Sequence, residues 1–176
     1  MIAELTVILW KISYMQTILE LDLFKETATH YELFYKLPPL TARIYALLVF
    51  NNCQDGLTFE ELLETFQSSK SSISNSINTL IELNFIEQFK KGSERKRHFR
   101  INKNLFLMRL EMVSKRLKSE KEINNKLREY RKSNCNELFK QEAFDIYNFH
   151  LEEVTQSIDK TIQNLKLHIK SNEKYD

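Results

Sequence analysis

Two short stretches of the sequence concentrate the side chains with the most distinctive chemistry. Between positions 69 and 78, seven of ten residues are Ser or Asn, which carry short hydrogen-bonding groups but favour helices weakly. Between positions 90 and 100, six Lys or Arg residues and one Glu give a charge of +5, so the rest of this +2 chain carries −3. Such polar groups can reach base edges and phosphates, and such cations attract phosphate.

A helix over residues 69–83 would separate its polar face from its apolar face. Ser69 is a favourable N-cap residue, and Asn84 suits a left-handed helix end. At about 100° per residue, Ser71, Asn75 and Asn78 lie roughly opposite the apolar stripe. The apolar stripe comprises Ile73, Ile77, Leu80 and Ile81. The alternative interpretation of residues 69–83 is a plain, solvated surface helix.

The neighbouring elements must hold these two stretches together. Thr58 and Glu61 form a capping box that predicts a short helix to Phe66, and residues 67–69 predict the turn before the next helix. After that helix, residues 85–89 and 99–101 predict two strands joined through Gly92-Ser93. A basic hairpin directly after a helix-turn-helix indicates phosphate binding much more strongly than a basic loop alone.

In this order, the motifs resemble the winged-helix regulators of the MarR superfamily, most closely the GbsR-type subgroup. The resemblance covers residues 37–101 and rests on the Leu37-Pro38-Pro39 lead-in, the helix start at 69–74 and the wing at 92–99. It implies a dimeric, DNA-binding repressor, and family members often bind a small effector between the dimer helices and the winged domain. The chain departs from the family pattern at Gln67, Ser68 and Asn84.

The expected site therefore combines a recognition helix with a wing. Helix 69–83 would enter the major groove of double-stranded DNA, and wing 90–100 would lie on the backbone or in the adjacent minor groove. Arg43 could contact a phosphate, or could simply be an exposed or salt-bridged arginine. The expected DNA-contacting residues are Lys70, Ser71, Ser72, Ser74, Asn75, Asn78, Lys91, Arg95, Lys96 and Arg97.

Length and composition predict a mainly α fold with a small β-wing. The 176 residues include only two Gly and two Pro, which argues against sandwiches, barrels and Gly-rich nucleotide loops. We expect an N-terminal helical segment at 1–36, a winged helix-turn-helix domain at 37–103 and a C-terminal helical region at 104–176, with both flanking segments serving dimerisation.

The first residues are apolar but do not read as a signal or membrane helix. Residues 1–14 contain Glu4 and Lys11 and are shorter than the roughly 18 residues that span a bilayer. We expect a cytoplasmic protein. One hypothesis places the true start at Met15, with the preceding stretch either an artefact of the assigned start or an extra dimer-packing strip. Residues 15–35 predict a helix with an interruption at Thr27–Thr29.

The C-terminal region predicts two long helices, at 105–132 and 137–171, separated by a break at 134–136. The second would be about 50 Å long, far longer than a compact domain of this size needs. Its apolar stripe then needs a partner, and a second copy of the chain is the natural one because two-fold dimers dominate soluble oligomers. The expected dimer-interface residues are Leu151, Val154, Ile158, Ile162, Leu165 and Ile169.

Nothing in the sequence predicts an enzyme, a metal site or a cofactor. The four His residues form no zinc or catalytic spacing, and Cys53 and Cys135 fit a reducing cytosol. Two alternatives remain open: a winged-helix module that binds an acidic protein, and a sensor whose specificity lies in effector binding. A cage for a quaternary-ammonium effector could draw on Phe34, Tyr35, Tyr45, Phe139, Phe144, Tyr147 and Phe149.

Overall fold

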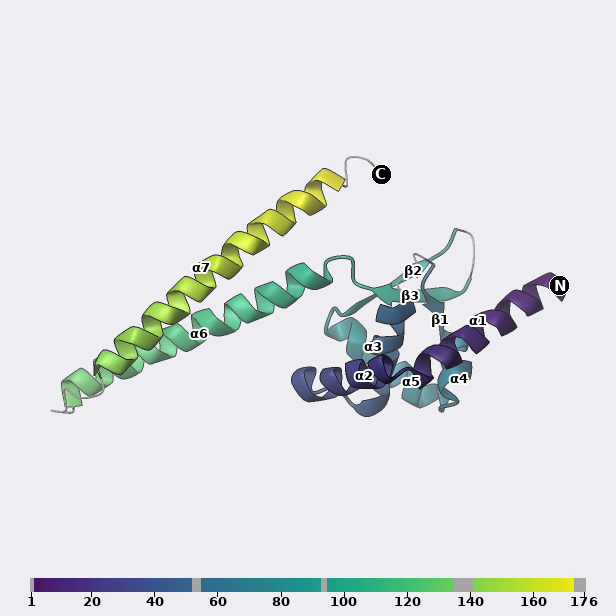
Figure 1. Ribbon diagram of the computed structural model, residues 1–176, viewed down its shortest axis with the longest axis horizontal. Helices are drawn as coiled ribbons and strands as arrows, with labels where there is room; N and C mark the ends of the chain where they lie inside the picture. Colours follow the sequence, from purple (N-terminus) through teal and green to yellow (C-terminus); the bar gives the residue numbers. More distant parts are fainter. Residues whose placement is uncertain (1, 52–54, 93–94, 135–140, 173–176) are drawn as a thin grey trace. The chain divides into compact units, whose positions relative to one another are not determined.

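The computed structural model describes the backbone of residues 2–51, 55–92, 95–134 and 141–172, and the side chains of residues 10–51, 55–92, 95–134 and 142–171. The chain forms two compact units, residues 1–103 and residues 104–176. The first holds five helices and a three-stranded sheet among its described residues, and the second holds two long helices (Figure 1). The predicted mainly α fold with a small β-wing is confirmed.

Three helices precede the helix-turn-helix: α1 (Ile2–Glu20), α2 (Asp22–Tyr35) and α3 (Pro39–Asn51). The predicted interruption at Thr27–Thr29 is wrong, because the break falls at Leu21, whose backbone is extended. The two threonines remain helical, and each donates its hydroxyl to the carbonyl four residues earlier. Asp22 carries its negative charge at the start of α2, where the helix dipole favours it.

Helix α1 packs into the first unit. Ile12, Met15 and Ile18 are buried, and the hydroxyl of Thr65 in α4 (Phe59–Phe66) contacts the Met15 sulfur at 3.8 Å. The Lys11 ammonium lies 2.8 Å from a Glu61 carboxylate oxygen. A chain that began at Met15 would lose the contacts of Lys11 and Ile12.

The helix-turn-helix forms as the local signals predict. Thr58 caps α4 (Phe59–Phe66) through the complete capping box with Glu61. Gln67 takes the left-handed conformation at the end of α4, although it is not glycine. The Ser69 hydroxyl accepts a hydrogen bond from the Ser72 amide at the start of α5 (Lys70–Glu82). Asn84 has a φ of 57°, as expected for the residue after this helix.

The sheet has three antiparallel strands in the order β1-β3-β2. Strands β2 (Ile86–Lys90) and β3 (Arg97–Ile101) are the predicted wing, with Lys90 opposite Arg97. Strand β1 (Leu57–Thr58) was not predicted, because two residues are too few to show a period. It pairs with β3 and so ties the base of the wing to the start of α4.

The centre of the first unit is helix α3, where Ile44, Tyr45 and Leu47 are fully buried. The Tyr45 ring lies 4.6 Å from the Tyr31 ring of α2 and 5.1 Å from the Phe85 ring, measured between centroids. These aromatic contacts join α2 and α3 to Phe85, which lies between the end of α5 and the start of β2. They hold the end of α5 and the start of β2 in a fixed position.

The second unit is an antiparallel pair, α6 (Leu105–Asn134) and α7 (Gln141–Asn172), shown in Figure 1. The start of α6 faces the end of α7, since the Lys166 ammonium lies 2.8 Å from a carboxylate oxygen of Glu111. Near the opposite end of the pair, the Asn148 side chain donates to the Asn125 side chain at 3.0 Å. Residues 137–140 of the predicted last helix lie outside the described residues.

The expectation that the α7 stripe has no partner in its own chain is wrong. Leu151 and Ile162 are buried on the side of α7 that contacts α6, where Asp159 accepts a hydrogen bond from Ser114 at 2.7 Å. The four other residues of the expected dimer interface are only half-buried. These are Val154, Ile158, Leu165 and Ile169.

Candidate nucleic-acid interface

Helix α5 presents a polar outer face. Lys70, Ser71, Asn75 and Asn78 are exposed, whereas Ser76 is buried and meets the Thr41 hydroxyl of α3 at 3.0 Å. The Asn75 side-chain amide makes no hydrogen bond within the described part of the chain. It is therefore free to pair a donor and an acceptor with a base edge.

Ser71 and Ser72 were predicted as groove contacts, but their hydroxyls already have partners. The Ser69 hydroxyl lies 2.9 Å from that of Ser71 and 2.8 Å from that of Ser72. This hydroxyl cluster surrounds the N-cap of α5. Ser71 is exposed and Ser72 half-buried, and their role as groove contacts stays a prediction.

The positive charges of the wing are not equivalent. Lys91 forms an exposed ion pair with Asp55 at 2.8 Å, and the hydrogen bond from Lys91 lowers the pKa of the Asp55 carboxyl. Arg100 pairs with Glu87 at 2.5 Å, and its guanidinium lies over the Phe89 ring. The charges of Lys91 and Arg100 are thus partly compensated by carboxylates. Lys90, Arg95, Lys96 and Arg97 make no ion pair with any described residue.

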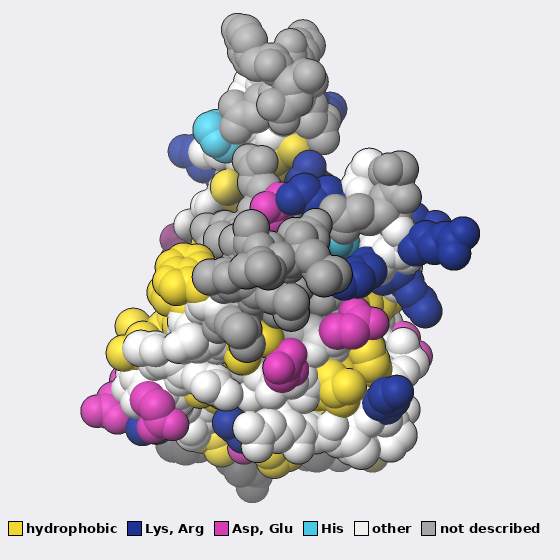
Figure 2. All heavy atoms as spheres, turned by 90° about the vertical axis from the view of Figure 1, so that its right-hand side faces the viewer, with side chains coloured by type: hydrophobic (Ala, Val, Ile, Leu, Met, Phe, Trp, Pro, Cys, Tyr) yellow, Lys and Arg dark blue, Asp and Glu magenta, His cyan; other side chains and the backbone are white. Residues whose placement is uncertain are grey.

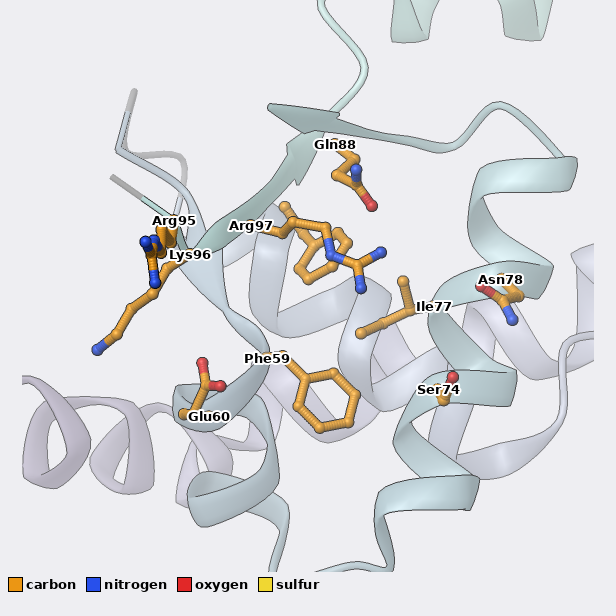
Figure 3. A pocket seen from close by; sticks show the side chains of 10 residues that line it. Phe59, Glu60, Ser74, Ile77, Asn78, Gln88, Arg95, Lys96 and Arg97 are labelled. Carbon is orange, nitrogen blue, oxygen red and sulfur yellow. The ribbon is translucent and has the colours of Figure 1, made fainter. Parts of the chain in front are cut away.

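A cleft of about 440 Å³ lies between the wing and the helix-turn-helix (Figure 3). Its apolar floor is formed by Phe59, Ile77 and Phe99, which come from α4, α5 and β3. The polar and charged residues around this floor are Glu60, Ser74, Asn78, Gln88, Arg95, Lys96 and Arg97. The cleft therefore brings together residues of the two stretches that the sequence singles out.

Within the cleft, Arg97 differs from the two cations before it. Figure 3 shows the Arg97 guanidinium directed from β3 into the cleft, toward Ile77 of α5, whereas Arg95 and Lys96 point away from that helix. On the face drawn in Figure 2, several Lys and Arg side chains project from one edge into solvent. Arg97 of β3 and Asn78 of α5 thus line the same cleft.

The base of the wing contains residues that the sequence analysis missed. Gly56 has a φ of +61°, and a Cβ atom there would lie 2.6 Å from the Phe99 carbonyl oxygen. His98 is buried, and its Nδ1 atom lies 2.9 Å from the Asp55 carbonyl oxygen. Lys11 also donates to the Gly56 carbonyl at 3.3 Å. The one available signal was the rarity of glycine, since the chain has only two.

Of the residues expected to form an aromatic cage, Phe144 and Tyr147 line one pocket of about 310 Å³ together with Asn124 and Ala143, and the effector stays a prediction. The Tyr45 ring is completely buried against other rings, so no ligand can reach it. The Phe144 ring already has a cation over it, the Arg131 guanidinium at 4.8 Å. Tyr147 donates its hydroxyl to Glu120, which raises its pKa. Phe139 lies outside the described residues, as do Cys53 and Cys135.

No group of three or more His, Cys, Asp or Glu residues in the described part of the chain could hold a metal ion. None of the described helices combines the length and the apolar character needed to cross a membrane.

Comparisons with known proteins extend these observations to the level of the fold. No model of a known protein family matches the sequence, and neither does any curated protein. A solved structure described as a transcriptional regulator is 16% identical over 82% of this chain and 95% of its own, with a TM-score of 0.57. A mutant MepR from a multidrug-resistant S. aureus clinical isolate is 15% identical over 81% and 88% of the two chains, with a TM-score of 0.39. The first of these likenesses shows that the chain has the fold of that regulator.

Proposed function

We propose that this protein is a sequence-specific, double-stranded DNA-binding transcriptional regulator of the MarR superfamily, acting in the cytoplasm as a repressor. The observation that carries the proposal is the cleft shared by α5 and the wing. It is lined by Arg97 of the wing and by Ser74 and Asn78 of α5. The shared fold with a transcriptional regulator supports the same conclusion.

The two elements would have different tasks in such a complex. Helix α5 would lie in the major groove, where exposed Asn75 and Asn78 can each make paired hydrogen bonds to a base edge. The wing would lie along the sugar-phosphate backbone, because Arg95, Lys96 and Arg97 are exposed cations at its tip. The bound site would be read by the helix and held by the wing.

The proposal includes a homodimer formed through the terminal helices. Because α6 and α7 use one side of each helix to contact each other, their exposed apolar residues lie elsewhere on the pair. Several are large enough to form an interface: Phe106, Met112, Ile123, Leu127, Tyr130, Ile146, Phe149 and Leu167. A second copy of the chain would cover them, and two winged domains would then reach two half-sites about one helical turn apart.

Selection of bound duplexes from a random-sequence pool tests the proposal directly. The full-length protein should enrich a two-fold symmetric motif, and the enriched duplex should bind more tightly than its scrambled version at the same salt concentration. Binding to all duplexes without enrichment would show that the protein binds DNA without sequence preference. Failure to retain any duplex would overturn the proposal and favour the module that binds an acidic protein partner.

A further inference from the structure

Arg43 in α3 is a surface arginine that stacks on an aromatic ring. It is exposed and makes no ion pair with any described residue. Its guanidinium carbon lies 5.3 Å from the centroid of the Phe66 ring. Stacking on an aromatic ring restricts a guanidinium while leaving its edge N–H groups free to donate hydrogen bonds.

This stacking places Arg43 at the turn of the helix-turn-helix. Phe66 is the last residue of α4, and its carbonyl accepts a hydrogen bond from the Ser68 hydroxyl at 3.2 Å. Ser69 then caps α5, and exposed Lys70 is the first residue of that helix. Two cations without described ion pairs, Arg43 and Lys70, therefore lie at the N-terminal end of the recognition helix.

The wing approaches a later part of the same helix. The cleft that receives Arg97 is lined on the α5 side by Ser74, Ile77 and Asn78. The recognition helix thus has cations at its start and beside its second half. A major groove is about 12 Å wide and is bounded by a phosphate backbone on each side. When a helix lies in the groove, cations near its two ends can each contact a different one of these two phosphate backbones.

We infer that Arg43, held against Phe66, binds a DNA phosphate on the strand opposite the one that the wing contacts. The inference rests on the proposed function and adds a contact outside both the recognition helix and the wing. Arg43 supplies the hydrogen bonds and the charge. Phe66 is a positioning residue that acts through Arg43.

The test is a salt series of binding isotherms on a random-sequence duplex. Arg43→Ala should flatten the dependence of log affinity on log salt by about 0.9 for each protomer bound, because one fewer phosphate is neutralised. Over a fourfold change in salt, that corresponds to about a 3.5-fold smaller change in affinity. Arg43→Lys should keep the slope. Lys25→Ala is the matched control, an exposed cation of α2 paired with Asp22, and should change nothing.

The role of Phe66 is tested with a double-mutant cycle. Phe66→Leu should weaken binding less than Arg43→Ala does and should leave the slope unchanged, because the charge remains. In the Arg43→Ala background, Phe66→Leu should have no further effect on affinity. Losses that simply add would show that Phe66 does not act through Arg43. Melting temperatures of all variants identify any loss that comes from unfolding.

Arg97→Ala, measured in parallel, separates this inference from the proposed function. If Arg97→Ala flattens the slope and Arg43→Ala does not, Arg43 is not a phosphate contact although the protein binds DNA through its wing. If the wild-type protein binds no duplex at any salt concentration, the proposed function and this inference both fail.

Discussion

At the residue scale, Asn75 provides the clearest test of base reading. Its side-chain amide is exposed and makes no hydrogen bond within the described residues, and alanine is the better helix former. Asn75→Ala should therefore preserve the fold. It should weaken binding to the selected duplex by about 1–3 kcal/mol and leave the affinity for random DNA nearly unchanged. Isotherms on both duplexes measure this, with exposed Asn164→Ala of α7 as the control. An equal loss on both duplexes would contradict the placement of α5 in the groove.

Arg97 should behave in the opposite way, because phosphate is present in every sequence. Arg97→Ala should weaken binding to the selected and the random duplexes alike. It should also flatten the slope of log affinity against log salt by about one unit per protomer. The measurement is the same pair of isotherms across a salt series. A loss confined to the selected duplex would mean that Arg97 reads a narrow minor groove instead.

Gly56 determines how closely the base of the wing can approach the chain before α4. A Cβ atom there would lie 2.6 Å from the Phe99 carbonyl oxygen, and the φ of +61° also disfavours any other residue. Gly56→Ala should destabilise the first unit by about 2 kcal/mol, in the range of strained backbone positions. Thermal unfolding measures this loss. Gly92→Ala is the control, since a Cβ atom at Gly92 meets nothing within 4 Å although its φ is also positive.

At the element scale, the contact between α6 and α7 contains ion pairs and buried polar residues. Lys121 pairs with Glu152, and Lys118 pairs with Asp159 at 2.7 Å. Asn148, Thr155 and Ser114 are buried polar residues of the two helices. This polar contact leaves fewer apolar side chains between the helices. Much of the unit's apolar surface consequently remains available for a partner.

These pairs make the stability of the two helices depend on pH. Hydrogen bonds from Lys118 and then Ser114 lower the pKa of Asp159, and hydrogen bonds from Lys121 and Gln156 lower that of Glu152. A carboxyl group whose pKa is lower in the folded state stabilises that state above its unfolded pKa, which is about 4. The stability is lost as the pH falls through the lower, folded value.

Acid unfolding followed by circular dichroism should therefore show a loss of helix below about pH 4. Asp159→Asn should lower stability at neutral pH and make it less dependent on pH in this range. Glu142→Gln is the control, because Glu142 is exposed and makes no ion pair with a described residue. An Asp159→Asn protein with the acid transition of the wild type would show that this pair does not contribute.

At the scale of the whole molecule, assembly should depend on the exposed apolar residues of the terminal helices. Ile123 and Leu127 are 52% and 43% exposed, four residues apart on α6. Replacing both with Glu should produce a monomer with normal helix content and much weaker binding to the selected duplex, because one protomer reaches one half-site. Light scattering and circular dichroism measure the two properties. A wild-type protein that is monomeric at micromolar concentration would contradict the dimer.

Ile162→Lys should have a different effect from substitutions at these exposed residues. Ile162 is buried on the side of α7 that contacts α6, so a charge there should unfold the helix pair before it affects assembly. Loss of helix content is expected, not a folded monomer. The other residues of the predicted interface, such as Ile158, are half-buried, and their role in dimerisation remains a prediction.

Much of the winged helix could be predicted from the sequence because its signals are local. The Thr58–Glu61 capping box, the Ser69 N-cap and the left-handed Asn84 depend on residues a few positions apart. Helix and strand periods likewise act over one or two turns. For the same reason, the polar face of α5 and the charge of the wing can be read from residue order alone.

The tertiary structure decided what depends on residues far apart in the chain. Strand β1 exists because β3 pairs with it from about 40 positions later, and Lys91 forms an ion pair with Asp55, which lies before that strand. The apolar stripe of α7 is covered by α6, although its period alone could not distinguish this partner from a second copy. The direction of Arg97 into the cleft could not be predicted either, since residues of α5 and β3 line one cleft only in the folded unit. Local patterns specify elements, whereas side-chain partners depend on how those elements pack.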